Sequence, residues 1–269
     1  MKVQNKVILV TGGGSGMGRE LVLNLLSKNA KVIAIDINQN GLQETVALAG
    51  ENKDKLSTFV VDITSKSAVE ALFEKAITQF GFVDGIINNA GIIQPFIKVN
   101  ELGYEAIERV MNVNFYGTLY MVKTFLPHLL TRPEAHIVNI SSMGGFLPVP
   151  GQSVYGASKA AVKLLTEALH SELANTNVKV TVAFPGAVNT NITKNSGLNM
   201  PAQSTAKNKS MKVLSATKAA QIMIDGMEKD SYRVMVGNDA KFMDFIYRLN
   251  PAYAAGFISK KMKSLLPGN

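Results

Sequence analysis

Two side chains that can move a proton together stand four residues apart in this chain. Tyr155 and Lys159 belong to the run Ser-Val-Tyr-Gly-Ala-Ser-Lys, and Ser142 lies thirteen residues before the tyrosine. Four residues make about one helical turn, so the phenol and the ammonium are expected on one helix face. A neighbouring positive charge favours the phenolate and lowers a tyrosine pKa that is otherwise about 10. With a serine hydroxyl to bind the substrate oxygen, the group suits proton transfer at a carbon that bears oxygen.

The N-terminal region predicts a nucleotide site that could supply the hydride carrier for this chemistry. Residues 6–11 form an apolar, β-branched run typical of a buried parallel strand. They lead into a glycine-rich turn, residues 12–18, and then into an amphipathic helix. Glycines let the backbone approach phosphates, and a helix N-terminus supplies N–H groups. Because Met17 stands where a third glycine would fall, the pattern is Thr-Gly-x-x-x-Gly-x-Gly, and it is neither G-x-G-x-x-G nor a P-loop.

The second expected strand, residues 31–36, ends in Asp36. A carboxylate at that place in a dinucleotide-binding fold accepts both hydroxyls of the adenosine ribose. It would repel a 2′-phosphate, and position 37 is Ile rather than a cation, so NAD is predicted over NADP. Arg19 lies nearby and is the one feature that points the other way.

In order and spacing, these motifs resemble those of the short-chain dehydrogenase/reductase family. The matching residues are Thr11-Gly-x-x-x-Gly16-x-Gly18, Asp62 after a third strand, Asn88-Asn-Ala-Gly91, Asn114, Ser142, Tyr155-x-x-x-Lys159 and Pro185-Gly186. The resemblance extends over residues 5–190.

The resemblance implies a catalytic role for four residues. Tyr155 would be the general acid/base, and Ser142 would orient the substrate oxygen. Lys159 would lower the tyrosine pKa and hydrogen-bond the nicotinamide ribose, while Asn114 would hold a water that links Lys159 to solvent.

The resemblance also implies a set of cofactor contacts, which run along the carboxyl edge of the expected sheet. Asp62 and Ile63 would hold the adenine edge, and Val188 and Thr190 would bind the nicotinamide carboxamide. The full predicted set is Gly12, Ser15, Gly16, Met17, Gly18, Asp36, Asp62, Ile63, Asn89, Ala90, Gly91, Tyr155, Lys159, Pro185, Gly186, Val188 and Thr190.

Seven apolar runs alternate with helical patterns along the 269 residues, 46% of which are hydrophobic. The runs are residues 6–11, 31–36, 56–61, 84–88, 135–141, 178–184 and 232–236. This alternation predicts an α/β fold: a single Rossmann-type, doubly wound domain with a seven-stranded parallel sheet flanked by helices. Within residues 1–269 we expect a cofactor and catalytic core at 5–190, a substrate lid at 191–218 and a C-terminal helical extension at 239–269.

Composition excludes several other kinds of chemistry. The chain has no cysteine, which excludes disulfides, thiolate catalysis and cysteine metal sites. The three histidines, His128, His136 and His170, lack ligand spacing, so no metal is predicted. No Gly-x-Ser-x-Gly occurs, which removes the nucleophile elbow of a hydrolase. Neither a signal peptide nor a membrane-spanning run is apparent, so the cytoplasm is the expected location.

The net charge of +8 is concentrated in the expected lid, which carries lysines and no acid. Its lysines are Lys194, Lys207, Lys209, Lys212 and Lys218. They are either solvated side chains on a loop or a means of attracting an anionic substrate, such as a fatty acid, a coenzyme A ester or a carrier-protein conjugate.

The C-terminal extension holds two apolar stripes separated by Pro251. The first consists of Phe242, Phe245, Ile246 and Leu249, and the second of Tyr253, Phe257, Ile258, Met262 and Leu265. Three interpretations stay open: packing on the core or on a partner copy, walling an apolar substrate pocket, or weak contact with an anionic membrane surface. The tail differs from that of the family's carrier-protein reductases and is similar to relatives that act on lipophilic alcohols, retinoids or steroids.

The sequence therefore predicts an NAD-dependent enzyme that interconverts a secondary alcohol and a ketone on an apolar or amphiphilic small molecule. A homodimer or homotetramer is expected. One alternative is an NADPH-dependent 3-ketoacyl-type reductase, and another is a dinucleotide-binding interaction protein without turnover. Nucleic-acid binding is not favoured, because no recognition motif accompanies the basic charge.

Overall fold

Seven strands form one parallel sheet in the computed structural model, which describes residues 1–190, 192–198 and 213–262. The order across the sheet is β3-β2-β1-β4-β5-β6-β9. The strands are β1 (Val7–Thr11), β2 (Lys31–Asp36), β3 (Leu56–Val60), β4 (Gly85–Asn88), β5 (Ala135–Ile140), β6 (Val178–Pro185) and β9 (Arg233–Val236). Every predicted strand is present, and each boundary falls within one residue of the prediction. The doubly wound α/β fold is confirmed.

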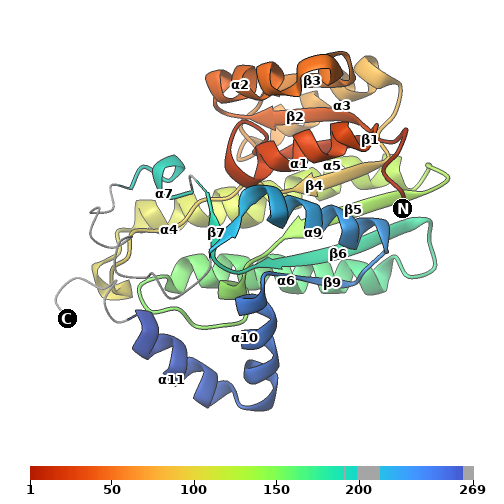
Figure 1. Ribbon diagram of the computed structural model, residues 1–269. Coiled ribbons are helices and arrows are strands. Elements are labelled where there is room, and N and C mark those ends of the chain that lie inside the picture. Colours follow the sequence, from red (N-terminus) through yellow and green to blue (C-terminus); the bar gives the residue numbers. More distant parts are fainter. Residues whose placement is uncertain (191, 199–212, 263–269) are drawn as a thin grey trace.

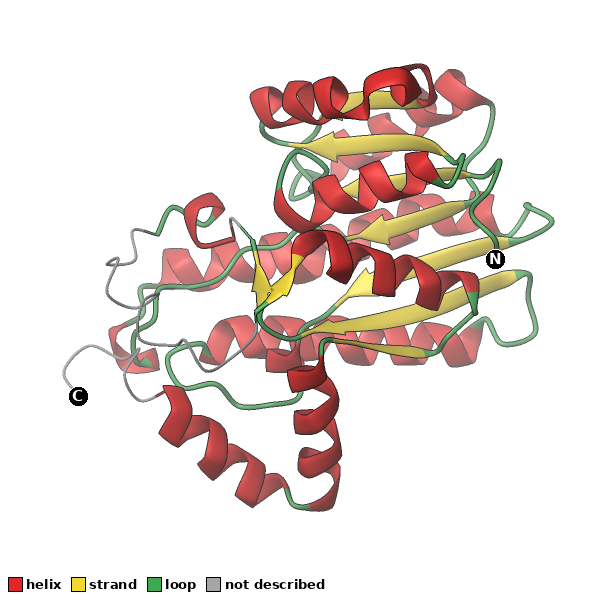
Figure 2. Ribbon diagram, in the orientation of Figure 1, coloured by secondary structure: helices red, strands yellow, loops and turns green. Residues whose placement is uncertain are grey.

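Helices cover both faces of the sheet (Figures 1 and 2). One face packs on α1 (Gly16–Ser27), α2 (Gln39–Ala49) and α9 (Ala216–Glu228). The other packs on α3 (Lys66–Phe80), α5 (Thr118–Leu129) and α6 (Ser153–Glu172), with α4 (Tyr104–Met111) leading into α5. Because both faces are buried, the central strands are continuous apolar runs: all five residues of β1 are buried.

Parallel strands all end at the same edge of the sheet, which gathers the predicted motifs in one place. The glycine-rich turn follows β1, Asp36 ends β2, the Asn-Asn-Ala-Gly motif ends and follows β4, and Ser142 follows β5. The chain runs outward from β1 to β3 on one side and restarts at β4 on the other. Such a reversal leaves a crevice at the carboxyl ends of the central strands.

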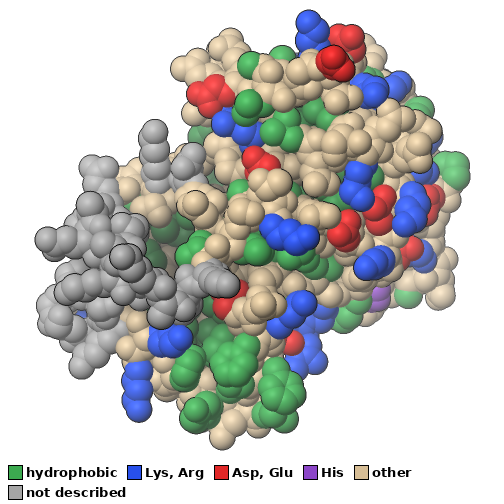
Figure 3. All heavy atoms as spheres, in the orientation of Figure 1, with side chains coloured by type: hydrophobic (Ala, Val, Ile, Leu, Met, Phe, Trp, Pro, Cys, Tyr) green, Lys and Arg blue, Asp and Glu red, His purple; other side chains and the backbone are tan. Residues whose placement is uncertain are grey.

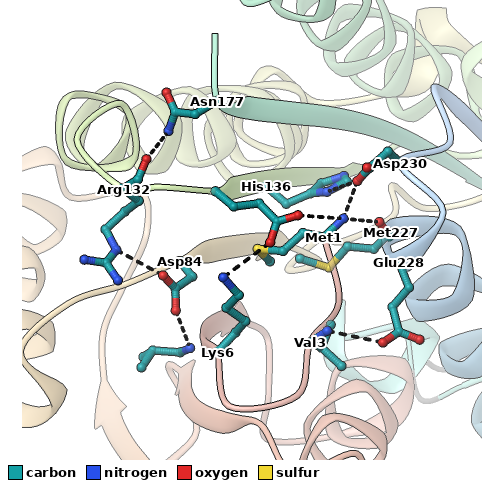
Figure 4. Close-up of polar contacts among 12 residues, drawn as sticks. Met1, Val3, Lys6, Asp84, Arg132, His136, Asn177, Met227, Glu228 and Asp230 are labelled. Atoms are coloured by element: carbon teal, nitrogen blue, oxygen red, sulfur yellow. Dashed lines mark hydrogen bonds and ion pairs between the residues drawn. The ribbon is translucent and has the colours of Figure 1, made fainter.

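The opposite, amino edge is held by paired charges (Figure 4). Asp84, which is 1% exposed, accepts a hydrogen bond from Arg132 Nε at 3.0 Å and another from the backbone N–H of Val7 at 2.9 Å. Lys6 lies 3.3 Å from a carboxylate oxygen of Glu134. Each of these acids comes directly before a strand, so the network aligns the starts of β1, β4 and β5.

His136 is a fully buried member of this amino-edge network. The Thr181 hydroxyl donates to the Ser231 carbonyl at 2.6 Å, so it must accept from His136 Nε2, which lies 2.8 Å away. Asp230, which also contacts the Met1 amine, lies 3.4 Å from His136 Nδ1. Burial, with the nearby amine, lowers the pKa of His136 to about 3, so the imidazole is neutral near pH 7.

Part of the expected lid falls within the described residues. A short helix, α7 (Ile192–Asn195), follows β7 (Val188–Asn189), and β7 pairs in parallel with β8 (Leu214–Ser215). Lys218 lies on α9, where its ammonium donates to Gln221 Oε1 at 2.9 Å. Lys207, Lys209 and Lys212 lie outside the described residues, so their part in substrate attraction stays a prediction.

The C-terminal extension forms two helices, α10 (Asn238–Leu249) and α11 (Pro251–Met262), with Pro251 opening the second as predicted. Their inner side packs against the segment that follows Ser142. The apolar cluster comprises Met143, Phe146, Leu147, Val149, Met243, Ile246, Tyr247, Ala254, Phe257, Ile258 and Met262. Packing within the chain is thus confirmed for one side of the helices.

The outer side of these helices is exposed, and Figure 3 shows hydrophobic side chains gathered at that end of the molecule. The exposed residues are Phe242, Phe245, Leu249 and Tyr253. Leu265 lies outside the described residues. None of the helices in the described ranges is long and apolar enough to cross a membrane.

Candidate active site

A cavity of about 420 Å³ lies at the carboxyl edge, where the strand order reverses. The glycine-rich turn and the ends of β2, β3 and β4 form most of its wall. The predicted cofactor residues in the wall are Gly12, Ser15, Gly16, Met17, Gly18, Asp36, Asp62, Ile63, Asn89, Ala90, Gly91 and Thr190. Open α/β sheets bind ligands in a crevice of this kind.

The glycine-rich turn needs its glycines for steric reasons. Gly12 and Gly16 have φ angles of 71° and 51°, which disfavour other residues. A Cβ on Gly18 would overlap the carbonyl oxygen of Gly12. Helix α1 begins at Gly16, and the Ser15 hydroxyl before it accepts from Asn195 Nδ2 at 2.8 Å instead of capping the helix. The first turn of α1 holds no acid, so its N–H groups and dipole fit a pyrophosphate.

Asp36 presents its carboxylate to the cavity. Oδ2 accepts from the Gly14 N–H at 3.0 Å, and Oδ1 accepts from the Asn38 N–H at 2.9 Å. Arg19 turns to other acceptors: its guanidinium pairs with Glu44 at 2.6 Å and donates to the Gly14 carbonyl. Arg19, the nearby cation that could bind a 2′-phosphate, is therefore already paired with groups of the protein.

The motif after β4 is tied to β1 by hydrogen bonds. Thr11 Oγ1 accepts from the N–H groups of Asn89 and Ala90 at 3.0 and 2.9 Å, and Asn89 Nδ2 donates to the Thr11 carbonyl at 3.0 Å. Asp62 Oδ1 accepts from the Thr64 N–H at 2.9 Å and shapes the turn after β3. These contacts hold the cavity wall in place before any ligand arrives.

Tyr155 and Lys159 lie one turn apart on α6, as predicted. Lys159 is 4% exposed, and its Nζ donates to the Ile140 carbonyl at 2.9 Å. A Cβ on Gly91 would lie 3.1 Å from that Nζ, so the lysine sits directly behind the cavity wall. Burial lowers the pKa of Lys159 to about 8.

The prediction of a lowered Tyr155 pKa is wrong. Burial raises the pKa of Tyr155 above its usual value, because it disfavours the charged phenolate, while a hydrogen bond with Ser142 acts in the opposite direction. The lysine ammonium is directed at the Ile140 carbonyl instead. Ser142 Oγ also accepts from the Gly144 N–H at 3.0 Å, which fixes the serine beside the tyrosine ring.

Asn114 lies in a π-helical turn, Asn112–Gly117, between α4 and α5. Its side chain is fully buried: Oδ1 accepts from the Ile92 N–H at 2.9 Å, and Nδ2 donates to the Ile92 carbonyl and to Ser158 Oγ. Ser158 in turn donates to the Tyr155 carbonyl at 2.7 Å. Both polar atoms of the Asn114 side chain are thus hydrogen-bonded to other protein groups. The predicted water relay from Asn114 to Lys159 stays a prediction.

Not every predicted cofactor residue reaches the cavity. Pro185, Gly186 and Val188 are absent from the cavity wall that the described residues form, as are Tyr155 and Lys159. The segment after β6 is held by α10 instead: the Ala187 N–H donates to Asp239 Oδ2 at 2.7 Å, and the Asp239 carboxylate lies against Gly186. The cavity therefore corresponds to the adenosine and pyrophosphate half of the predicted site.

Known proteins place this chain in a family. The model of the short chain dehydrogenase family matches residues 6–201. The chain belongs to that family. It is 37% identical over 252 residues to SadH, an oxidoreductase by name, of Mycobacterium tuberculosis, with 91% of each chain covered. It is 33% identical over 194 residues to the 3-oxoacyl-[acyl-carrier-protein] reductase FabG of Thermotoga maritima, with 72% of this chain and 78% of the reductase covered.

Solved structures agree with that assignment. A short chain dehydrogenase/reductase from Burkholderia phymatum in complex with NAD superposes with a TM-score of 0.83 at 26% identity, with 93% of this chain and 96% of that one covered. The 3-ketoacyl-(acyl-carrier-protein) reductase from Brucella melitensis complexed with NADH gives 0.78 at 26% identity, with 87% and 97% covered. The chain is an oxidoreductase of the short-chain dehydrogenase family.

Several residues of this dehydrogenase site escaped the sequence analysis. Arg109, Ile192 and Asn195 line the cavity, although they stand far in sequence from the glycine-rich turn. Asn195 closes over that turn through its bond to Ser15. Arg109 in α4, and Ile192 and Asn195 in the short helix α7, carry no motif, so only their position in the fold identifies them.

The three histidines have structural surroundings. His128 Nε2 accepts from the Val83 N–H at 3.1 Å, and His170 Nδ1 lies 3.1 Å from the Val180 carbonyl. His136 belongs to the amino edge described above. Within the described ranges, no group of three or more His, Asp or Glu side chains could hold a metal ion.

Proposed function

We propose that this short-chain dehydrogenase interconverts a secondary alcohol and a ketone with NAD(H), on an apolar or amphiphilic substrate. The arrangement of Ser142, Tyr155, Lys159 and Asn114 next to the cavity at the carboxyl edge carries the proposal. No member of this group is missing, and each is held by hydrogen bonds to the protein or to another member.

Each residue has a distinct task in the proposed reaction. Bound NAD would supply the acceptor for the hydride of the alcohol carbon. Tyr155 takes the hydroxyl proton at its phenolic oxygen, and Ser142 holds the substrate oxygen in place. Lys159 supplies positive charge that favours the phenolate, and that charge is needed because burial alone raises the tyrosine pKa. Asp36, Gly16 and Gly18 would hold the dinucleotide at the other end of the site.

Asp36 supports NAD over NADP. Its carboxylate faces the cavity with no adjacent cation from Arg19, which is paired with Glu44. A 2′-phosphate would have to approach that carboxylate, and like charges in contact cost several kcal/mol, about 2 or more. Among the described residues, Arg109 is the one cation that lines the cavity. Binding titrations with NAD and with NADP test whether Arg109 alters the preference for NAD.

An apolar substrate is supported by the segment between Ser142 and Tyr155. Met143, Phe146 and Leu147 belong to the cluster that this segment forms with α10 and α11. A 3-ketoacyl-type reductase is the second candidate, favoured by the identity to the Thermotoga maritima reductase and by the basic lid. A dinucleotide-binding protein without turnover is the candidate from another class.

A panel of secondary alcohols and ketones of graded chain length, assayed by NADH absorbance, tests the proposal. We expect turnover that improves with chain length and a lower KM for NAD than for NADP. Turnover confined to 3-ketoacyl esters with NADPH would favour the second candidate instead. Saturable NAD binding with no turnover of any compound would favour the non-enzyme candidate. A homodimer or homotetramer, a cytoplasmic location and weak membrane contact stay predictions.

A further inference from the structure

Three consecutive residues after the Asn-Asn-Ala-Gly motif contact three separate parts of the site. Ile92 exchanges hydrogen bonds with the Asn114 side chain through both its N–H and its carbonyl. The Ile93 N–H donates to Ser196 Oγ, which follows α7, at 3.0 Å. Gln94 reaches the N-terminus of α6, the helix that carries Tyr155. This short segment therefore joins the predicted relay, the lid side of the cavity and the tyrosine helix.

Gln94 serves as the cap of α6 from a distance in sequence. Its Oε1 accepts from the N–H groups of Val154 and Tyr155 at 2.8 and 2.9 Å. Gln152, the residue before the helix, makes no capping bond and instead donates from Nε2 to the Gln94 carbonyl at 2.9 Å. Gln94 Nε2 donates to the Gly151 carbonyl at 3.1 Å. The two N–H groups of α6 need an acceptor and the Gly151 carbonyl needs a donor, so the oxygen of the Gln94 amide must face α6 and its nitrogen must face Gly151.

The contact bears directly on the tyrosine. The first N–H groups of a helix have no partner within it, and leaving them buried and unpaired is unfavourable. Gln94 is fully buried and satisfies two of them, one of which belongs to Tyr155 itself. A displacement of about 1 Å in a catalytic group can reduce the rate roughly 10²-fold. The side chain of Gln94 thus sets where the backbone of Tyr155 lies.

We infer that Gln94 is a positioning residue for Tyr155, and that its amide must be neutral as well as capping. A glutamate would accept the same two N–H bonds, and a negative charge at a helix N-terminus is favourable. The same charge, beside the backbone N–H of Tyr155, would oppose the phenolate that catalysis requires. Glutamine provides the cap without this penalty. The inference rests on the proposed function of Tyr155 as acid/base.

Two variants separate the cap from the charge. Gln94→Met removes the cap at similar size. Gln94→Glu keeps the acceptor for the two N–H groups, adds charge and exchanges the donor to the Gly151 carbonyl for an oxygen. Ser65→Ala is the matched control, since Ser65 caps α3 by accepting from the Ala68 N–H at 3.3 Å and its side chain does not line the cavity, although Thr64 before it does. Two measurements follow: steady-state kinetics with NAD and a secondary alcohol, and ultraviolet titration of phenolate absorbance, with Tyr155→Phe in each background subtracted to isolate Tyr155.

For Gln94→Met we expect kcat to fall about 10- to 100-fold with the KM for NAD within about threefold of wild type. For Gln94→Glu we expect the pKa of Tyr155, and the rising limb of kcat with pH, to move upward by about half a unit or more. Ser65→Ala should leave three quantities unchanged: kcat, the pKa of Tyr155 from the phenolate titration, and the pH of the rising limb of kcat.

The titration needs no turnover, so it tests the inference even if every substrate fails. An unchanged Tyr155 titration in Gln94→Glu would overturn the electrostatic part. A kcat for Gln94→Met within twofold of wild type would overturn the positioning part. Equal losses in Gln94→Met and Ser65→Ala would show a general effect on stability and would also overturn it.

Discussion

The two edges of the sheet hold polar groups of similar kinds and use them differently. At the amino edge, Asp84 is satisfied by Arg132 and a backbone N–H, and Lys6 lies against Glu134. At the carboxyl edge, Lys159 is equally buried and has a carbonyl but no carboxylate as its partner. Removing one partner from a buried pair of opposite charges strongly destabilises a fold, and a buried, uncompensated cation also reduces its stability. The amino edge is therefore built for stability, and the carboxyl edge gives up stability for chemistry.

Removing the tyrosine hydroxyl should produce the largest effect on either edge. Tyr155→Phe removes the group that moves the proton and leaves the cavity wall intact, so we expect turnover to fall about 10²- to 10⁴-fold. NADH binding, followed by fluorescence titration, should be nearly unchanged. The melting temperature should change little near pH 7, because the phenol is neutral there in the folded and unfolded chain and only its hydrogen bond with Ser142 is lost. Retention of more than about a tenth of wild-type activity would contradict the role of Tyr155.

At the amino edge we expect the reverse: a substitution there should lower stability and leave turnover unchanged. Asp84→Asn keeps the shape of the side chain but leaves Arg132 without its counter-charge, and it places an amide against the Val7 N–H. We expect the free energy of unfolding to fall by about 2 to 4 kcal/mol, measured by denaturant titration. The kcat of the folded fraction should stay at the wild-type value. A lower kcat at unchanged stability would show that the two edges are not separate in function.

The difference between the edges also explains what the sequence could predict. Strand boundaries followed from apolar, β-branched runs such as β1 and β2, because strands buried on both faces have that composition. The glycine-rich turn and Asp36 were found because their chemistry is local: steric need at Gly18 and a carboxylate at a strand end. Local features of this kind are visible in a single sequence.

Other features depend on contacts between distant segments. Gln94 caps a helix about sixty residues away, and Asn195 reaches the turn at Ser15 from the far side of the chain. The direction of the Tyr155 pKa shift depends on burial, which only the packed structure sets. The spacing of Tyr155 and Lys159 indicates a neighbouring charge, but it does not show the burial that raises the pKa of Tyr155. Motif spacing thus identified the reacting groups, and tertiary packing decided their electrostatics.

Titration of Lys159 should expose the stability given up at the carboxyl edge. Its pKa is about 8 in the fold and 10.5 for the ordinary side chain, so the unfolded chain binds more protons between these pH values. Stability should therefore rise by about 2 kcal/mol from pH 7.5 to 9.5. Lys159→Met should remove this rise and abolish activity. A variant whose unfolding free energy keeps the wild-type rise would assign it to other groups.

His136 should give an effect of the same sense at the amino edge, in a lower pH range. Its pKa is about 3 in the fold against 6.5 for the ordinary imidazole, so protons bind preferentially to the unfolded chain as the pH falls from 6.5 towards 3. Between pH 7 and 5 the wild type should lose about 1 to 2 kcal/mol that His136→Gln does not lose. Glutamine serves as the replacement because its amide can still donate to Thr181, whose hydroxyl is committed to the Ser231 carbonyl. Matched acid sensitivity in the two proteins, measured by denaturant titration at both pH values, would mean that carboxylates rather than His136 limit the stability of this edge. Because His136 lies at the edge opposite the cavity, the kcat of the folded enzyme should be the same in both proteins at pH 7.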